Sequence, residues 1–132
     1  QKRIVQDASA LAYVYQSTSS TADKNRKGAY YTPISIIQSE LKQILKLNQN
    51  FCDPCCGGGN FLIEAYRQLV ELKSKEPHKL IFGYDYDKLA VLIARANMTL
   101  LTDGKCDVLK QIQHSNSLTN QDAFFYDVIS TN

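Results

Sequence analysis

The chain has 132 residues, of which 44% are hydrophobic and 21% are charged, a composition typical of a globular domain and not of a disordered chain. Its formal net charge of +2 is too small to indicate a nucleic-acid or membrane partner, and no apolar run approaches the roughly 18 residues of a membrane span. The first residues lack the apolar core of a signal peptide, so we expect a cytoplasmic protein.

The first predicted elements are two helices separated by a polar stretch. Apolar residues at helical spacing predict a helix over residues 2–16, and a polar loop follows around residues 23–28. A second helix is expected to open at Thr32 and Pro33, because threonine can cap a helix and proline suits its first turn. The apolar stripe of this second helix consists of Ile34, Ile37, Leu41, Ile44 and Leu45.

A glycine-rich turn joins the next two elements. A short strand is predicted at about residues 50–52, and a helix is predicted from Asn60 to about Lys73. The residues of this helix that we expect to face inward are Phe61, Leu62, Ala65, Leu69 and Leu72.

A second strand and a further helix follow. Residues 80–84 form a short apolar run typical of a buried strand. Asp87 is expected to cap a helix that begins at Lys88, reaches about Leu101 and is ended by Gly104.

The last part of the chain predicts two more strands. Residues 107–113 favour a strand, with a helix as the alternative, and residues 126–130 favour a fourth strand. Strands that alternate with helices are typical of a parallel sheet, which binds ligands beyond the carboxyl ends of its strands.

The cysteines do not form a convincing metal site. The chain has four of them: Cys52, Cys55, Cys56 and Cys106. His78 and His114 stand alone, so no second pair completes a zinc ligand set. We therefore predict small, mostly buried thiols and no metal.

The most informative stretch is the turn after the first strand, where Asp53 precedes Gly57, Gly58 and Gly59. Glycines there let the backbone turn sharply and let a ligand approach closely. The spacing fits neither a phosphate-binding P-loop nor a dinucleotide fingerprint, because Leu62 stands where the latter needs a third glycine. An acid here would repel a pyrophosphate and suit an ammonium group. The alternative is a purely structural turn.

A second acidic position follows the second strand, where Asp85 and Asp87 flank Tyr86. A carboxylate at this strand end can accept both hydroxyl hydrogens of a ribose diol, and Asp85 is better placed for this than the capping Asp87. Tyr86 could stack on a flat heterocycle, and two solvated turn acids are the alternative. Together the two positions favour a nucleoside with a cationic, zwitterionic tail, which S-adenosylmethionine fits.

Four segments occur in a distinctive order: residues 27–33 (KGAYYTP), residues 53–61 (DPCCGGGNF), Asp85 with residues 94–98 (ARANM), and residues 127–132 (DVISTN). In this order the chain resembles the class I S-adenosylmethionine-dependent methyltransferases, and among them the N6-adenine DNA methyltransferases. The resemblance covers most of the chain from residue 27. It implies a Rossmann-like α/β fold in which helices cover both faces of a parallel sheet. The sheet would be incomplete, with about four strands, and N-terminal helices would precede it.

The resemblance also implies a division of the chain and a cofactor. Residues 1–26 would form an N-terminal helix and polar loop, and residues 27–132 the part of the methyltransferase domain that binds S-adenosyl-L-methionine. The residues expected at the cofactor are Tyr30, Tyr31, Thr32, Asp53, Pro54, Gly57, Gly59, Asn60, Phe61, Asp85, Tyr86, Asn116 and Ser117. The family often has an acid near Asn116 for the adenine amino group. Here the Asn116 amide oxygen can accept instead, or Ser115 and Ser117 share the task.

Asn132 would be the catalytic residue. In the family this position opens an Asn/Asp/Ser-Pro-Pro-aromatic motif, which accepts a hydrogen bond from the amino group of a flipped-out adenine. The two prolines and the aromatic residue expected after Asn132 are absent from this sequence. We therefore expect the parent protein to methylate adenine N6 in DNA, within a restriction–modification system, and this chain alone to be an inactive cofactor-binding fragment.

The expected partners follow from the same resemblance. They are DNA, through the parent protein, and a specificity subunit or a fused nuclease, with no membrane. The strand over residues 126–131 would expose an edge, which allows self-association. The alternatives are an RNA-adenine or protein-glutamine methyltransferase of the same fold, and a non-catalytic module that binds S-adenosylmethionine.

Overall fold

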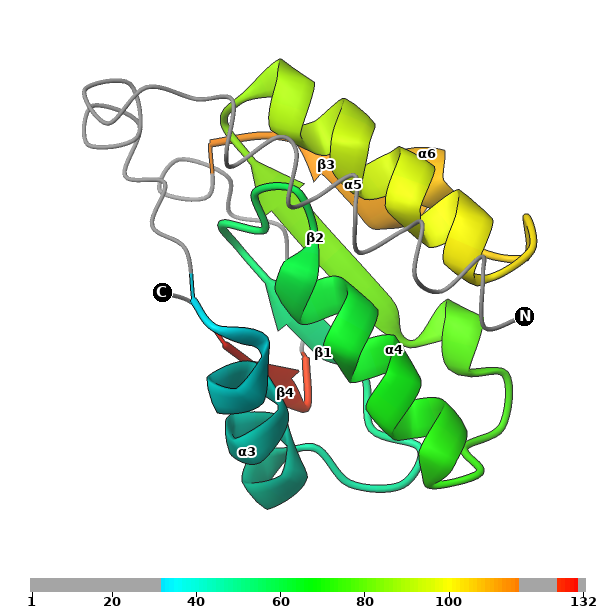
Figure 1. Cartoon of the computed structure of the whole chain (residues 1–132). Coiled ribbons are helices and arrows are strands. Elements are labelled where there is room, and N and C mark those ends of the chain that lie inside the picture. The colour runs from blue at the N-terminus through cyan, green and yellow to red at the C-terminus, as the bar shows by residue number, and fades with distance from the viewer. Residues whose placement is uncertain (1–31, 117–125, 131–132) are drawn as a thin grey trace.

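The fold is a parallel sheet with helices packed against it (Figure 1). The structure is a computed structural model that describes residues 32–116 and 126–130, so the helix expected over residues 2–16 lies outside the described residues. None of the helices within the described ranges is long and apolar enough to cross a membrane.

Four parallel strands form the sheet in the order β3-β2-β1-β4. They are β1 Phe51–Asp53, β2 Ile81–Asp85, β3 Ile112–His114 and β4 Val128–Ile129. All pairs are parallel, so the carboxyl ends of the strands meet at one edge of the sheet. The predicted α/β fold with a parallel sheet is confirmed. Strand β4 lies at the edge of the described sheet, and self-association through it stays a prediction.

Three helices account for most of the packing. They are α3 Ile34–Ile44, α4 Asn60–Glu71 and α5 Lys88–Leu101; the short elements are η1 Pro77–Lys79 and α6 Val108–Gln111. One core joins α3, α4 and α5 to the sheet face that carries Phe51, Ile81, Ile112 and Val128. The three long helices therefore share one face of the sheet.

Helix α3 begins one residue later than its capping signal suggests. Pro33 occupies the N-cap position and the helix starts at Ile34 without a side-chain cap, so the prediction that Thr32 caps it is wrong. Ile37 and Leu41 are buried as predicted, whereas Ile44 is exposed, because the helix ends there and Leu45 turns into the core instead.

Helix α4 agrees with its predicted pattern except at its last turn. Phe61, Leu62, Ala65 and Leu69 are buried, but Leu72 is 37% exposed and the prediction that it faces inward is wrong. The helix ends at Glu71, so Leu72 follows it as the C-cap.

Residues 107–113, for which the sequence favours a strand with a helix as the alternative, contain a short helix followed by the start of a strand. The short helix α6 comes first and β3 begins only at Ile112, so a strand over the whole range is wrong. The cause is Gln111, whose buried amide donates to the carbonyls of His78 (2.9 Å) and Ile81 (2.8 Å) and accepts from the Asp107 N–H (3.1 Å). These bonds hold a helical turn directly before the strand.

Helix α4 lies close to the middle of β2. A Cβ atom added to Gly83 would lie 2.8 Å from Leu62 Cδ1 and 3.2 Å from Cys56 Sγ. Glycine at this position thus allows α4 and the turn before it to sit directly on the strand.

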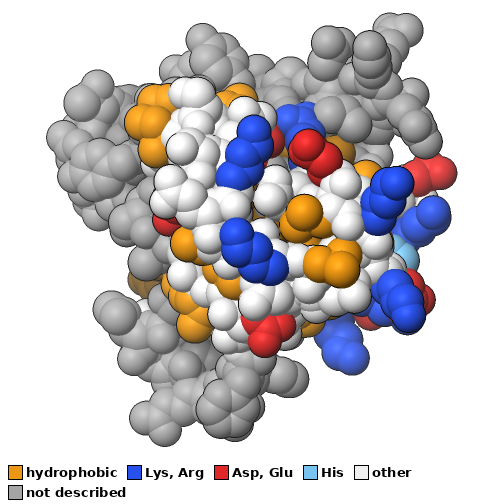
Figure 2. Space-filling view, turned by 90° about the horizontal axis from the view of Figure 1, so that it is seen from below, with side chains coloured by type: hydrophobic (Ala, Val, Ile, Leu, Met, Phe, Trp, Pro, Cys, Tyr) orange, Lys and Arg blue, Asp and Glu red, His pale blue; other side chains and the backbone are white. Residues whose placement is uncertain are grey.

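Charge is spread over the face seen in Figure 2. Basic side chains there are spaced among acidic, apolar and neutral ones, without merging into one basic patch over the described residues. This distribution agrees with the small net charge of +2.

Candidate ligand-binding site

The two acids singled out in the sequence end two neighbouring strands. Asp53 is the last residue of β1 and Asp85 the last residue of β2, and Asp53 is in register with Gly83. The glycine-rich turn leaves β1 at the same edge. This edge is where a parallel sheet binds ligands.

Asp85 ties the end of β2 to the glycine turn. Its Oδ2 accepts the N–H of Gly57 at 2.8 Å, and its Oδ1 accepts the N–H of Asp87 at 2.7 Å. Each oxygen of an ionised carboxylate keeps further acceptor capacity, so the half-buried group could still bind hydroxyl groups. The sequence did not indicate the contact with Gly57, since 28 residues separate the two partners.

Asp53 is almost completely enclosed, with 2% of its surface exposed. Its Oδ1 accepts the Cys55 N–H at 2.9 Å. Burial raises the pKa of this carboxyl from 3.8 to about 7; the Cys55 N–H opposes the rise in pKa and the charge of Asp85 adds to it. A cation placed beside Asp53 would favour the ionised form and reverse part of the shift.

The turn itself combines close packing with open space. Gly59 has φ 96° and forms the N-cap of α4, where an added Cβ would lie 3.3 Å from both Cα and Cβ of Ala94. Gly57 has φ 54°, and a Cβ there would meet no atom within 4 Å. The space above Gly57 suits the close approach of a ligand.

The start of α4 presents backbone rather than side chains. The first N–H groups of a helix have no intrahelical acceptor, and here the first such bond runs from the Ile63 N–H to the Gly59 carbonyl at 2.8 Å. No N-cap side chain accepts from the N–H groups before it. The Phe61 side chain is part of the core, and the predicted contact of Phe61 with a ligand could therefore involve only its backbone. Asn60 and Pro54 are half-buried beside the turn.

The end of β3 contributes the remaining described residues. The Ser115 N–H donates to the Asp85 carbonyl at 2.9 Å, so Asn116 follows directly and is exposed at the same edge. Tyr86 is 77% exposed, and its carbonyl is hydrogen-bonded to His114 Nε2 at 2.8 Å. An exposed ring next to Asp85 fits the stacking role predicted for Tyr86, which stays a prediction.

Several predicted residues cannot be placed. Tyr30, Tyr31, Ser117 and Asn132 lie outside the described residues. Thr32 is described and half-buried, directly before α3. The structure thus brings together the part of the predicted site that β1, β2 and β3 provide.

A cluster on the second face of the sheet was not anticipated. The hydroxyl groups of Tyr84 and Tyr126 are 2.7 Å apart, and the Tyr126 ring lies 5.3 Å from that of Phe82. Burial and the bond to Tyr84 raise the pKa of Tyr126, while burial raises the pKa of the Cys52 thiol to about 12. Tyr126 and Cys52 are therefore neutral at physiological pH. No spacing signal links Tyr84 to Tyr126.

The described cysteines are all free, and only Cys55 is exposed. Within the described ranges no three or more His, Cys, Asp or Glu side chains gather in a way that could hold a metal ion.

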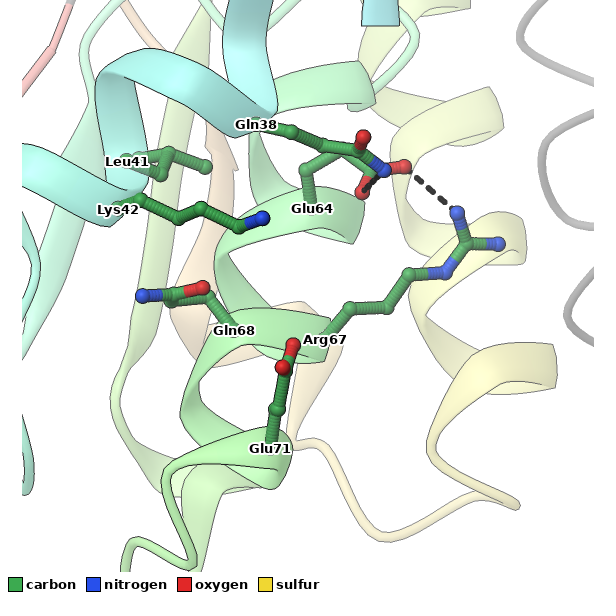
Figure 3. Close-up of a pocket in the computed structure, with 7 residues that line it drawn as sticks. All are labelled: Gln38, Leu41, Lys42, Glu64, Arg67, Gln68 and Glu71. Carbon is green, nitrogen blue, oxygen red and sulfur yellow. Dashed lines mark hydrogen bonds and ion pairs between the residues drawn. The ribbon is translucent and has the colours of Figure 1, made fainter. Parts of the chain in front are cut away.

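A cavity of about 220 Å³ lies between α3 and α4 (Figure 3). Glu64 is buried in its wall and accepts bonds from Arg67 (2.6 Å) and Gln38 (3.0 Å). None of the residues that line the cavity belongs to the predicted site. We regard this polar cluster as a structural contact between α3 and α4 that adds to their shared apolar core.

Comparisons of the sequence point to one family. A family profile described as N-6 DNA Methylase matches residues 7–132. The Type II methyltransferase M.VspI from Vibrio sp. is 36% identical over 124 residues, which are 92% of this chain and 29% of that protein. The Type I restriction enzyme EcoEI methylase subunit from Escherichia coli is 32% identical over 115 residues, or 80% of this chain and 23% of that protein. The chain thus spans less than a third of these curated relatives.

Solved structures share the fold. A modification subunit assigned to a type I restriction enzyme from Vibrio vulnificus superposes with a TM-score of 0.58 at 24% identity, covering 86% of this chain and 25% of that chain. A DrdV–DNA complex superposes with a TM-score of 0.61 at 19% identity, covering 85% of this chain and 13% of that chain. At these identities the similarity concerns the fold alone.

Proposed function

Because the chain belongs to the N-6 DNA methylase family, we propose that it forms the S-adenosyl-L-methionine-binding part of a DNA methyltransferase that acts on adenine N6. The relatives named as a type II methyltransferase and a type I methylase subunit favour a role in a restriction–modification system. In the whole protein, DNA would be the substrate, and a specificity subunit or fused nuclease a further partner.

One observation carries the assignment to this cofactor. The glycine turn after β1 is joined to the acid that ends β2 by the 2.8 Å bond from the Gly57 N–H to Asp85 Oδ2. Asp53 and Asp85 therefore lie at a single site, beside the open space above Gly57. Two acids and a side-chain-free turn fit a ligand with an ammonium group and a ribose diol, and they would disfavour a pyrophosphate.

The chain's own residues would have separate tasks. Asp53 would hold the ammonium group and Asp85 the ribose hydroxyls, while Tyr86 would cover the adenine ring. S-adenosyl-L-methionine, when bound, supplies a methyl group on a sulfonium, which is transferred to the adenine amino nitrogen. Asn132 would accept a hydrogen bond from that amino group, as the resemblance implies.

Calorimetric titration with S-adenosyl-L-methionine tests the binding half of the proposal. We expect Asp85→Ala to bind at least tenfold more weakly, because a hydrogen bond to a charged group contributes about 1.5–3 kcal/mol. Asp87→Ala is the matched control: it removes a neighbouring acid whose Oδ1 caps α5 through the Leu89 N–H at 2.9 Å. This control should lose stability and keep its affinity.

Two outcomes would contradict the proposal. Equal affinities of wild type and Asp85→Ala would remove Asp85 from the site. A full-length parent protein that binds the cofactor, yet transfers no labelled methyl group to adenine in DNA, would exclude the proposed reaction and leave a binding module.

A further inference from the structure

Asn97 is a buried polar residue that the proposed function leaves without a role. It lies on α5 with 0% of its surface exposed. Its Nδ2 donates to the Gly58 carbonyl at 2.8 Å, whereas its Oδ1 is buried and has no hydrogen-bond partner within the described residues. The opposite amide orientation would set two oxygens against each other, so the donor must face Gly58.

Packing alone does not explain an asparagine here. A buried oxygen without a donor is destabilising, and leucine has the same branched outline with no polar atom to desolvate. Asn97 lies on the buried side of α5, together with the fully buried apolar residues Ala94 and Met98. The residue is therefore explained by what its N–H group does.

The Gly58 carbonyl belongs to the middle residue of the glycine turn, a segment with little conformational preference of its own. Three consecutive glycines lose more backbone entropy on ordering than other residues would, so such a turn needs external anchors. Asp85 anchors the Gly57 N–H, and the Gly59 N–H donates to the Cys56 carbonyl at 2.9 Å. Asn97 supplies the anchor between them, from α5.

We propose that Asn97 is a positioning residue for the ligand-binding turn: it holds the Gly58–Gly59 peptide in its binding orientation before the ligand arrives. This assignment rests on the proposed function. Ordering the turn in advance lowers the entropic cost of binding, so loss of the anchor weakens affinity even though Asn97 need not touch the ligand.

Asn97→Leu separates this role from a merely structural one. Loss of the unpaired Oδ1 offsets part of the cost of leaving the buried Gly58 carbonyl without its donor, so the melting temperature should fall less than that of the control variant described below. The amide hydrogens of the turn, measured by NMR hydrogen exchange in the free 132-residue chain, should exchange at least about tenfold faster. The calorimetric Kd for S-adenosyl-L-methionine should rise by about tenfold or more.

Thr102→Val is the matched control, at the C-cap of the same helix. Thr102 is buried, donates to the Met98 carbonyl at 2.7 Å and accepts the Cys106 N–H at 3.0 Å, so its hydrogen bonds lie away from the turn. We expect this variant to melt at a lower temperature with unchanged turn exchange and Kd.

Amide exchange of the turn and the Kd together test the role of Asn97, and their results can be told apart from a failure of the proposed function. If Asn97→Leu keeps slow turn exchange and a wild-type Kd, or if both variants lose affinity in proportion to their melting temperatures, Asn97 is not a positioning residue. Should Asn97→Leu fail to fold, Asn97→Ala is judged by the same criteria. If the wild-type chain binds no cofactor, the proposed function fails, whereas the exchange measurement still tests the anchor.

Discussion

Replacement of Asp53 by asparagine should stabilise the protein at neutral and alkaline pH and leave it almost unchanged in acid. Asp53 is buried, and burial raises the pKa of its carboxyl to about 7. Asparagine has nearly the same shape, and its amide oxygen can still accept the Cys55 N–H that Asp53 Oδ1 accepts at 2.9 Å. The variant therefore removes the titration and keeps the local bonds.

The magnitude follows from the shift in pKa. Between pH 3.8 and about 7 the folded protein retains a proton that the unfolded chain has released. The free energy of unfolding of the wild type consequently falls as pH rises through this window, by about 1.4 kcal/mol per pH unit. The accumulated loss is about 4 kcal/mol above pH 7. Asp53→Asn has no such proton and should not show this loss.

Denaturation by urea at half-unit steps from pH 4 to pH 8.5 measures the effect. The difference in unfolding free energy between Asp53→Asn and wild type should grow across the window and become constant above it. Asp103→Asn, which removes an exposed acid, controls for the change in net charge. A difference for Asp53→Asn that does not vary with pH would refute the assignment of a raised pKa to Asp53.

Three further substitutions test particular contacts. Gly59→Ala should cost about 1–3 kcal/mol of stability, because the residue has φ 96° and packs against Ala94 of α5. A thermal melt measures the loss, and an unchanged melting temperature would contradict the close packing of Gly59 on Ala94. Glu64→Ala should lower the free energy of unfolding by about 2 kcal/mol in urea denaturation, because the buried carboxylate accepts two side-chain hydrogen bonds. Glu71 is exposed on the same helix, so the control Glu71→Ala should change stability by less than about 0.5 kcal/mol. Tyr126→Phe should lose about 1 kcal/mol through its 2.7 Å hydroxyl contact, and Tyr66→Phe serves as its control; equal stabilities of these two variants would speak against that bond.

The features that the sequence predicted well depend on neighbouring residues. The strand–turn–helix unit around the glycines, the cap at Asp87 and the order of strands and helices all follow from local spacing, and the structure confirms each. Parallel strands then bring Asp53 and Asp85 to the same edge without further information.

The features that the sequence did not predict depend on distant partners. The bond from Gln38 to Glu64 joins residues 26 positions apart, and that between Tyr84 and Tyr126 joins residues 42 apart. No periodic pattern encodes such pairs. The error over residues 107–113 has the same origin, because Gln111 is held in a helical turn by carbonyls some 30 residues earlier.

Gly83 lies outside the proposed site, yet packing can restrict the residue type at this position as strictly as ligand binding restricts the site residues. Any side chain there would meet the buried side chains of Leu62 and Cys56, which would have to shift and so disturb the packing of α4 and of the turn before it. We expect selection to retain glycine at residue 83 as strictly as the acids at residues 53 and 85. Invariance there in a set of related sequences should be attributed to the packing of α4 and not to contact with a ligand.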